Sequence, residues 1–131
     1  MKSKVELICI IDDDPIFVFG TQKLLQSRNF CNNFIIFSNG KDAIDNLKTY
    51  IASGQYLPEI ILLDLNMPIM DGWQFLAEFT KIPTPKKITI YIVSSSSDPK
   101  DVEKAKTYKA VNNYVIKPIS INKINTILED F

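Results

Sequence analysis

The sequence predicts an α/β protein with an open, doubly wound parallel sheet, and three observations support this fold class. Short apolar runs rich in Ile and Val alternate along the chain with longer segments of helical pattern. These runs lack the strict alternation of a half-exposed strand, which is typical of parallel strands covered on both faces. Five strand–helix units follow one another without a repeat or a linker-like stretch, so we expect helices on both faces of one sheet.

The expected elements follow one another in a regular order. The strands are the apolar runs VELICII (residues 5–11), FIIF (34–37), IILL (60–63), ITIYIV (88–93) and YVI (114–116). The helices lie between and after them, at residues 15–28, 41–53, 73–81, 99–108 and 121–130. In the last helix Ile121, Ile124 and Leu128 recur at i, i+3 and i+7, which predicts an apolar stripe facing the sheet.

Two of the expected helices begin with an Asp-Pro pair. At Asp14-Pro15 and again at Asp98-Pro99, the Asp is suited to cap free backbone N–H groups and the Pro to form the first helical turn. The first pair, however, ends a run of three consecutive carboxylates. One carboxylate is enough for a cap, so we assign the cap to Asp14 and expect another role for the two carboxylates before it.

Length and composition indicate one globular domain. The chain has 131 residues, of which 46% are hydrophobic and 23% charged, which suits a single packed core. Lys plus Arg and Asp plus Glu both number 15, so no overall field favours nucleic acid or an anionic membrane. We therefore expect a single domain over residues 1–131, without an output domain, a nucleic-acid partner or membrane insertion.

The residues that are rare or missing exclude several classes of function. The apolar run near the start is about seven residues long, too short for a signal peptide or a membrane span. Cys9 and Cys31 lack a metal-type spacing, and reduced, buried thiols predict a cytoplasmic protein. The chain has no histidine, so Ser-His triads and His-ligated zinc are excluded. Any phosphohistidine donor must be another protein.

Polar groups follow four of the expected strands. The first strand ends in the acidic run at residues 12–14, the third in Asp64, the fourth in Ser94-Ser95 and the fifth in Lys117-Pro118. Functional groups of open parallel sheets gather beyond the carboxyl ends of the strands. Each feature alone has an ordinary explanation, as a cap, a turn residue, loop filler or a surface lysine. Their joint placement at successive strand ends predicts a functional site.

Electrostatics narrow the chemistry of this site. If the first and third strands are neighbours, Asp12, Asp13 and Asp64 converge, and two charges about 4 Å apart repel by roughly 4 kcal/mol at an effective dielectric near 20. Three such pairs cost on the order of 10 kcal/mol, comparable with the stability of a whole domain. The fold must protonate a group or hold a cation, and oxygen ligands shared with a phosphate favour Mg²⁺. An acidic pocket with Mg²⁺ and Lys117 suits phosphoryl transfer to a carboxylate.

Four motifs resemble one known family over essentially the whole chain. They are IIDDDP (residues 10–15), ILLDLNMPIMDG (61–72), YIVSSSSDP (91–99) and YVIKPIS (114–120), in this order and with suitable separations. The sequence is similar to the CheY-like receiver domain of two-component response regulators. The resemblance implies a flavodoxin-like fold with strand order 2-1-3-4-5.

The resemblance implies a role for each acidic residue. Asp64 would be the phosphoacceptor and also a metal ligand. Asp13 would bind Mg²⁺ directly and Asp12 would hold it through water, while Asn66 would offer its backbone carbonyl.

The resemblance also implies a switch. Ser94 would hydrogen-bond the phosphoryl group, and Lys117 would pair with a phosphoryl oxygen, its bond to Pro118 being cis. Tyr114 stands at the position of the family's switch aromatic, which rotates inward when Ser94 moves. Ser96 is small and polar where many relatives carry a larger side chain.

These assignments predict a phosphorylation-dependent signalling switch. It would accept its phosphoryl group from a histidine kinase or a histidine phosphotransfer protein and would signal by protein contact, without turning over a separate substrate. The expected output face comprises the fourth helix, the fifth strand and the fifth helix. The first helix begins PIFVFG, so at least one of residues 16–19 should remain near the surface. That surface either contacts the kinase or packs against the last helix.

Three other functions compete with this interpretation. A haloacid-dehalogenase-type phosphatase also uses an Asp nucleophile and Mg²⁺, but it needs a second Asp where this chain has Asn66. An FMN-binding flavodoxin needs a phosphate-cradling loop after the first strand, where this chain has three acids. A receiver domain that binds partners without phosphorylation keeps the same fold, and only a labelling assay distinguishes it.

Overall fold

The computed structural model describes residues 4–129, with the backbone alone for residues 128 and 129. Within this range, five parallel strands form one sheet in the order β2-β1-β3-β4-β5, which confirms the predicted fold class. The strands are β1 (Ile8–Ile11), β2 (Phe34–Phe37), β3 (Ile60–Leu63), β4 (Thr89–Ser94) and β5 (Val111–Ile116). The helices are α1 (Pro15–Ser27), α2 (Gly40–Ser53), α3 (Gly72–Phe79), α4 (Pro99–Ala105) and α5 (Ile121–Glu129).

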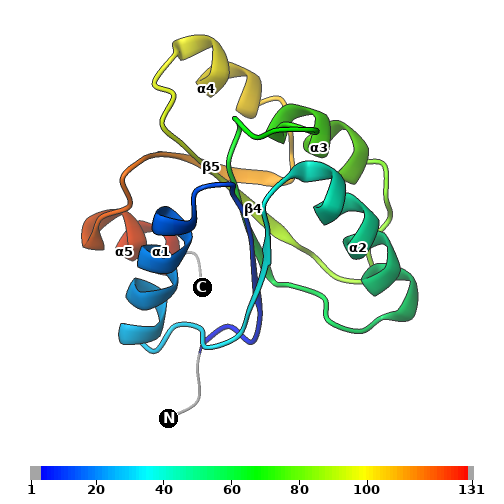
Figure 1. Cartoon of the computed structure of the whole chain (residues 1–131), viewed down its shortest axis with the longest axis horizontal. Coiled ribbons are helices and arrows are strands. Elements are labelled where there is room, and N and C mark those ends of the chain that lie inside the picture. Colours follow the sequence, from blue (N-terminus) through cyan, green and yellow to red (C-terminus); the bar gives the residue numbers. More distant parts are fainter. Residues whose placement is uncertain (1–3, 130–131) are drawn as a thin grey trace.

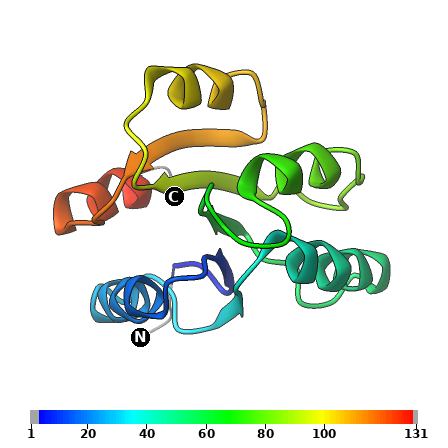
Figure 2. The same ribbon diagram turned by 45° about the horizontal axis from the view of Figure 1, so that its top comes forward.

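The helices cover the sheet on both faces, as its apolar strands require (Figure 1). α1 and α5 lie on one side of the sheet and α2 and α3 on the other in Figure 2, where α4 lies above the edge strand β5. Ala105 of α4 packs into the same core as residues of α2 and α3. Two separate groups of buried apolar side chains fill the space on the two faces. β1, β3 and β4 are buried along their whole length, which explains why their sequences do not alternate between apolar and polar residues.

Three strands begin at other residues than the apolar pattern predicts, and β4 is shifted by one residue, to Thr89–Ser94. β1 begins at Ile8, because the backbone N–H of Val5 donates to the carbonyl of Phe30 (2.9 Å) in a loop outside the sheet. β5 begins three residues earlier than expected and includes Asn112 and Asn113, which are exposed. As an edge strand β5 does not need two apolar faces, so its first half carries no apolar signal.

The first three helices differ from the expected bounds by one or two residues, and the last two differ in ways that affect packing. α4 ends at Ala105 and the chain turns through Tyr108, whose N–H donates to the carbonyl of Ala105 (3.2 Å). In α5 the buried residues are Ile124 and Ile127, whereas Ile121 at the first position is 55% exposed. The predicted stripe was therefore wrong for Ile121, and the side chain of Leu128 lies outside the described residues.

Polar side chains fix the helix starts. The carboxylate of Asp14 accepts from the N–H groups of Ile16 and Phe17, so this third acid of the run caps α1 as predicted. Asp98 caps α4 in the same way, accepting from the N–H of Lys100. The capped starts of α1 and α4 lie at the carboxyl ends of β1 and β4, which fixes the loops that carry the site.

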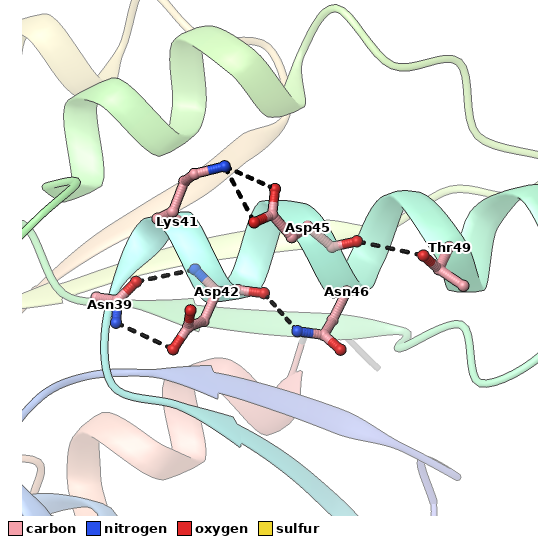
Figure 3. Close-up of polar contacts among 6 residues, drawn as sticks. All are labelled: Asn39, Lys41, Asp42, Asp45, Asn46 and Thr49. Carbon is pink, nitrogen blue, oxygen red and sulfur yellow. Dashed lines mark hydrogen bonds and ion pairs between the residues drawn. The ribbon is translucent and has the colours of Figure 1, made fainter.

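The start of α2 shows the same chemistry (Figure 3). The side chain of Asn39 accepts from the N–H of Asp42 and donates to its carboxylate. The ammonium of Lys41 donates to both carboxylate oxygens of Asp45, one turn further along the helix, each at 3.0 Å. Both of these side chains are more than half exposed, so the pair contributes well under 1 kcal/mol. The helix is held mainly by its buried face.

Candidate functional site

The structure brings the predicted polar groups together at the carboxyl end of the sheet. Asp12 and Asp13 follow β1, Asp64 follows the neighbouring β3, Ser94 ends β4 and Lys117 follows β5. β1 lies between β2 and β3, so the first and third strands are neighbours as the electrostatic argument assumed. The convergence expected from the sequence is confirmed.

Three carboxylates form the acidic part of the site. Asp12, Asp13 and Asp64 each offer an oxygen, and these oxygens lie within 4.8 Å of one another. Asp12 and Asp64 are buried, at 3% and 5% exposure, whereas Asp13 is exposed. Burial, and after it the neighbouring charge of Asp12, raise the pKa of Asp64 to about 6 against the opposing charge of Lys117. Burial raises the pKa of Asp12 as well, against the hydrogen bond and charge of Lys117.

Lys117 reaches into this acidic group. Its Nζ lies 2.9 Å from Oδ2 of Asp12 and 3.8 Å from Oδ1 of Asp64. The same ammonium sits 4.3 Å from the centre of the Phe17 ring, at the start of α1, in a cation–π contact. The bond between Lys117 and Pro118 is cis, as predicted. The role of Phe17 was not found from the sequence, because the contact joins elements 100 residues apart and has no local pattern.

The donor set fits a hard divalent cation. Oδ1 of Asp12 accepts from the N–H of Asp14 (2.9 Å), whereas Oδ2 is buried and, in the described part of the chain, makes only its ion pair with Lys117. Three carboxylates against one ammonium leave a formal charge of −2 at full ionisation. Oxygen donors with this imbalance suit Mg²⁺ or Mn²⁺.

The turn after β3 is built closely around Asp64. The N–H of Gly72 donates to the carbonyl of Leu65 (2.9 Å), and a Cβ on Gly72 would lie 2.4 Å from the backbone oxygen of Asp64. Glycine is therefore required where α3 starts. Asn66 is exposed on this turn, and its backbone N–H donates to the Asp64 carboxylate and helps to lower its pKa.

The loop between β4 and α4 links the predicted switch residues. Ser94 is fully buried, and its Oγ accepts from the N–H of Ser96 (3.1 Å). The hydroxyl of the half-buried Tyr114 donates to the carbonyl of Ser96 (2.8 Å). The N–H of Lys117 donates to the carbonyl of Ser94 (2.8 Å), which joins the ends of β4 and β5. Ser96 therefore connects the two switch positions through its backbone.

Large apolar side chains are exposed on α1 beside this rim. Ile16 is 83% and Phe19 62% exposed, whereas Val18 is buried against the core. The expectation that at least one residue of the PIFVFG segment remains at the surface is confirmed. The buried face of α1 is formed instead by Val18, Thr21 and Leu25.

Comparisons with known proteins agree with this geometry. A family model described as the response regulator receiver domain matches residues 8–129. The crystal structure of a two-component response regulator from Cytophaga hutchinsonii is 31% identical, with a TM-score of 0.86, covering 97% of this chain and 96% of that one. The Mn²⁺-bound form of response regulator Rcp1 is 26% identical, with a TM-score of 0.76, covering 95% and 89% of the two chains.

A sequence relative points the same way. Two-component response regulator 24 of Arabidopsis thaliana is 29% identical over 120 residues, covering 91% of this chain and 78% of its own length. Two longer relatives bear enzyme names, and this chain spans only 31% and 26% of their lengths, so the module also occurs joined to catalytic parts. Among the described residues, no helix is both long and apolar enough to cross a membrane. The chain belongs to the response regulator receiver family, the phosphorylation-dependent switches of two-component signalling.

Proposed function

We propose that Asp64 accepts a phosphoryl group from a phosphohistidine of a histidine kinase or a histidine phosphotransfer protein. The observation that carries this proposal is a buried carboxylate at a strand end, in one cluster with Asp12, Asp13 and Lys117. A carboxylate oxygen of Asp64 attacks the phosphorus, the P–N bond breaks, and the imidazole leaves with the electron pair. With its pKa raised to about 6, Asp64 is still mainly the nucleophilic carboxylate at neutral pH, and a neighbouring positive charge would favour this form further.

A divalent cation supplies that charge when bound, and it also neutralises the phosphoryl oxygens. Asp12, Asp13, Asp64 and the backbone carbonyl of Asn66 would hold it. The buried Oδ2 of Asp12, whose described contact is its ion pair with Lys117, supports this assignment, as does the Mn²⁺ in the relative Rcp1. Lys117, already 3.8 Å from Asp64, would pair with a phosphoryl oxygen in place of its carboxylate partners.

Ser94 and Tyr114 would report the phosphoryl group to the rest of the domain. The Ser94 hydroxyl would turn toward a phosphoryl oxygen, and Tyr114 would follow because both contact Ser96. The surface formed by α4, β5 and α5 then carries the signal to a downstream protein. We place the protein in the cytoplasm, because Cys9 and Cys31 are free, buried thiols whose pKa burial raises.

The exposed apolar residues of α1 would contact the phosphodonor. Ile16 and Phe19 lie at the helix start next to the acidic site, and Phe19 carries Lys23 over its ring at 5.3 Å. This surface suits an apolar helical face with acidic residues at its margin. Turnover of a separate substrate is not part of the proposal, because Asn66 cannot act as the acid–base that a phosphatase of the haloacid dehalogenase type needs at that position.

Labelling with acetyl phosphate tests the proposal without any partner protein. With Mg²⁺ present, the chain should gain one phosphoryl group by mass, stable in acid and released by hydroxylamine. Asp64→Asn should abolish the gain, whereas Asp45→Asn, which removes an exposed carboxylate from α2, should not. Equal labelling of the Asp64→Asn protein, or equal labelling in EDTA, contradicts the assignment.

A further inference from the structure

We propose that the side chain of Ser96 is a positioning residue that couples the phosphorylation site to helix α4 through Asp101. This inference rests on the proposed function and names the connection by which the site moves the output face. Ser96 belongs to the loop between β4 and α4, and it contacts three other parts of the molecule. Each contact uses a different group of the residue.

The backbone of Ser96 faces the site. Its N–H donates to Oγ of Ser94 at 3.1 Å, and its carbonyl accepts from the hydroxyl of Tyr114 at 2.8 Å. Ser94 is fully buried, so its hydroxyl has little room to turn unless the loop that follows moves with it. A displacement of Ser94 therefore displaces Ser96.

The side chain of Ser96 faces α4. Its hydroxyl donates to Oδ2 of Asp101 at 2.6 Å and accepts from the N–H of Asp98 at 3.3 Å. The hydrogen bond to Asp101 is partly buried and has the short length typical of a hydroxyl that donates to a carboxylate. Because the acceptor is charged, this bond is stronger than one between two neutral groups. Asp101 lies in the first turn of α4. The Ser96 hydroxyl is thus a direct link between the loop and the helix.

Helix α4 is held by few other contacts, so this link matters. The helix has seven residues, all of them described, and of these only Ala105 is buried. A cleft of about 210 Å³ lies between α4 and β5, and Tyr114 of β5 is among the residues that line it. In the last turn of α4, Lys104 lies over the ring of Trp73 of α3, with Nζ 4.6 Å from the ring centre. A short helix with so little buried surface can shift as a unit.

Trp73 makes the shift measurable. It is the single tryptophan of the chain, and it stacks on Tyr108, just after α4, with ring centres 6.2 Å apart. Its fluorescence therefore reports the position of α4, which it touches through Lys104. The amide NMR signals of α4 give a second readout of the same movement.

The experiment compares variants of the full chain saturated with Mg²⁺ and beryllofluoride, a mimic of the phosphoryl group on Asp64. In the wild type, both the pocket amides and the α4 signals should change. In Ser96→Ala and in Asp101→Ala the α4 change should fall at least about fivefold, the lower end of couplings between sites, while the pocket change remains. The double variant should lose no more than either single variant, since both remove one bond.

Two controls separate a positioning role from general damage. Ser96→Thr keeps the hydroxyl and should restore the α4 response. Glu103→Ala removes an exposed carboxylate of the same helix. This carboxylate pairs with Lys106 and not with Ser96, so the variant should keep the wild-type response. If Ser96→Ala keeps the full α4 response, or if wild-type α4 signals stay still while the pocket signals move, the coupling role is wrong and the phosphoacceptor assignment stands. If acetyl phosphate does not label the wild type, the proposed function fails and the coupling inference falls with it.

Discussion

The acidic cluster should make the metal-free protein less stable at neutral pH than it would be without the charge of Asp64. Asp64 is 5% exposed, and burial beside Asp12 raises its pKa to about 6 from the ordinary value of about 4. A folded-state pKa above the unfolded value means that the folded state binds more protons between pH 4 and pH 6. Stability therefore falls as the pH rises through this window and is lowest above it.

The size of the effect follows from the same values. Ionising a carboxyl whose pKa is raised from about 4 to about 6 costs the folded state about 3 kcal/mol at pH 7. Asp64→Asn removes the charge and keeps an oxygen that can accept from the N–H of Asn66. The variant should be more stable than the wild type by about 1–3 kcal/mol at pH 7 in EDTA, which is about 3–5 °C in Tm per kcal/mol for a chain of this length. At pH 4 the two proteins should differ little.

Thermal unfolding followed by circular dichroism at pH 4 and pH 7, in EDTA, measures this difference. Asp45→Asn is the matched control, because it neutralises an exposed carboxylate paired with Lys41 and should change stability by at most about 0.5 kcal/mol at either pH (Figure 3). A wild type that is more stable than Asp64→Asn at pH 7, or a difference that is the same at both pH values, would falsify the electrostatic reasoning.

Three further predictions concern the metal, the turn after β3 and the donor surface. Mg²⁺ at ten times its Kd should stabilise the wild type by about 1.4 kcal/mol, and Asp13→Asn should lose most of this gain; an equal gain contradicts metal binding at Asp13. Gly72→Ala should lower stability by 2 kcal/mol or more, as measured by urea unfolding, and slow acetyl phosphate labelling, since its Cβ would meet the backbone of Asp64; a variant as stable as the wild type refutes the close packing. Ile16→Asp and Phe19→Asp should slow phosphoryl transfer from a histidine donor at least about tenfold with acetyl phosphate labelling intact, and parallel losses in both assays indicate a damaged fold instead.

The sequence was a reliable guide wherever burial leaves a pattern. The strands at residues 34–37 and 60–63 have the predicted bounds, because an apolar run between polar loops has one way to lie in a covered sheet. The meeting of Asp12 with Asp64 also followed from the sequence, since strand ends of a parallel sheet share one edge. The same reasoning assigned Asp14 to the cap of α1, because a residue before proline at a helix start has a defined local partner.

The remaining features depend on contacts between distant segments. Phe17 beneath Lys117 and the hydroxyl of Ser96 on Asp101 involve ordinary residue types in ordinary loops, so no spacing marks them. The first half of β5 was missed because Asn112 and Asn113 are exposed at the sheet edge, where pairing with β4 replaces the apolar signal. In each case the backbone or a tertiary contact, rather than a periodic pattern, decides the structure.

The buried sheet and the charged cluster at the carboxyl ends of its strands together explain how this domain could act as a switch. Fully buried β1, β3 and β4 hold Asp12 and Asp64 together, although one ammonium from Lys117 leaves the cluster with an excess of negative charge. A divalent cation would act on this imbalance directly, because its positive charge would relieve the repulsion among the carboxylates. A phosphoryl group on Asp64 would add negative charge, which the cation and Lys117 would have to balance. The loop through Ser96 and the lightly packed α4 lie beside the cluster and have little buried surface to resist a shift. We therefore expect a rigid sheet with a charged rim and a weakly held helix to convert a change of charge at Asp64 into a change of surface at α4.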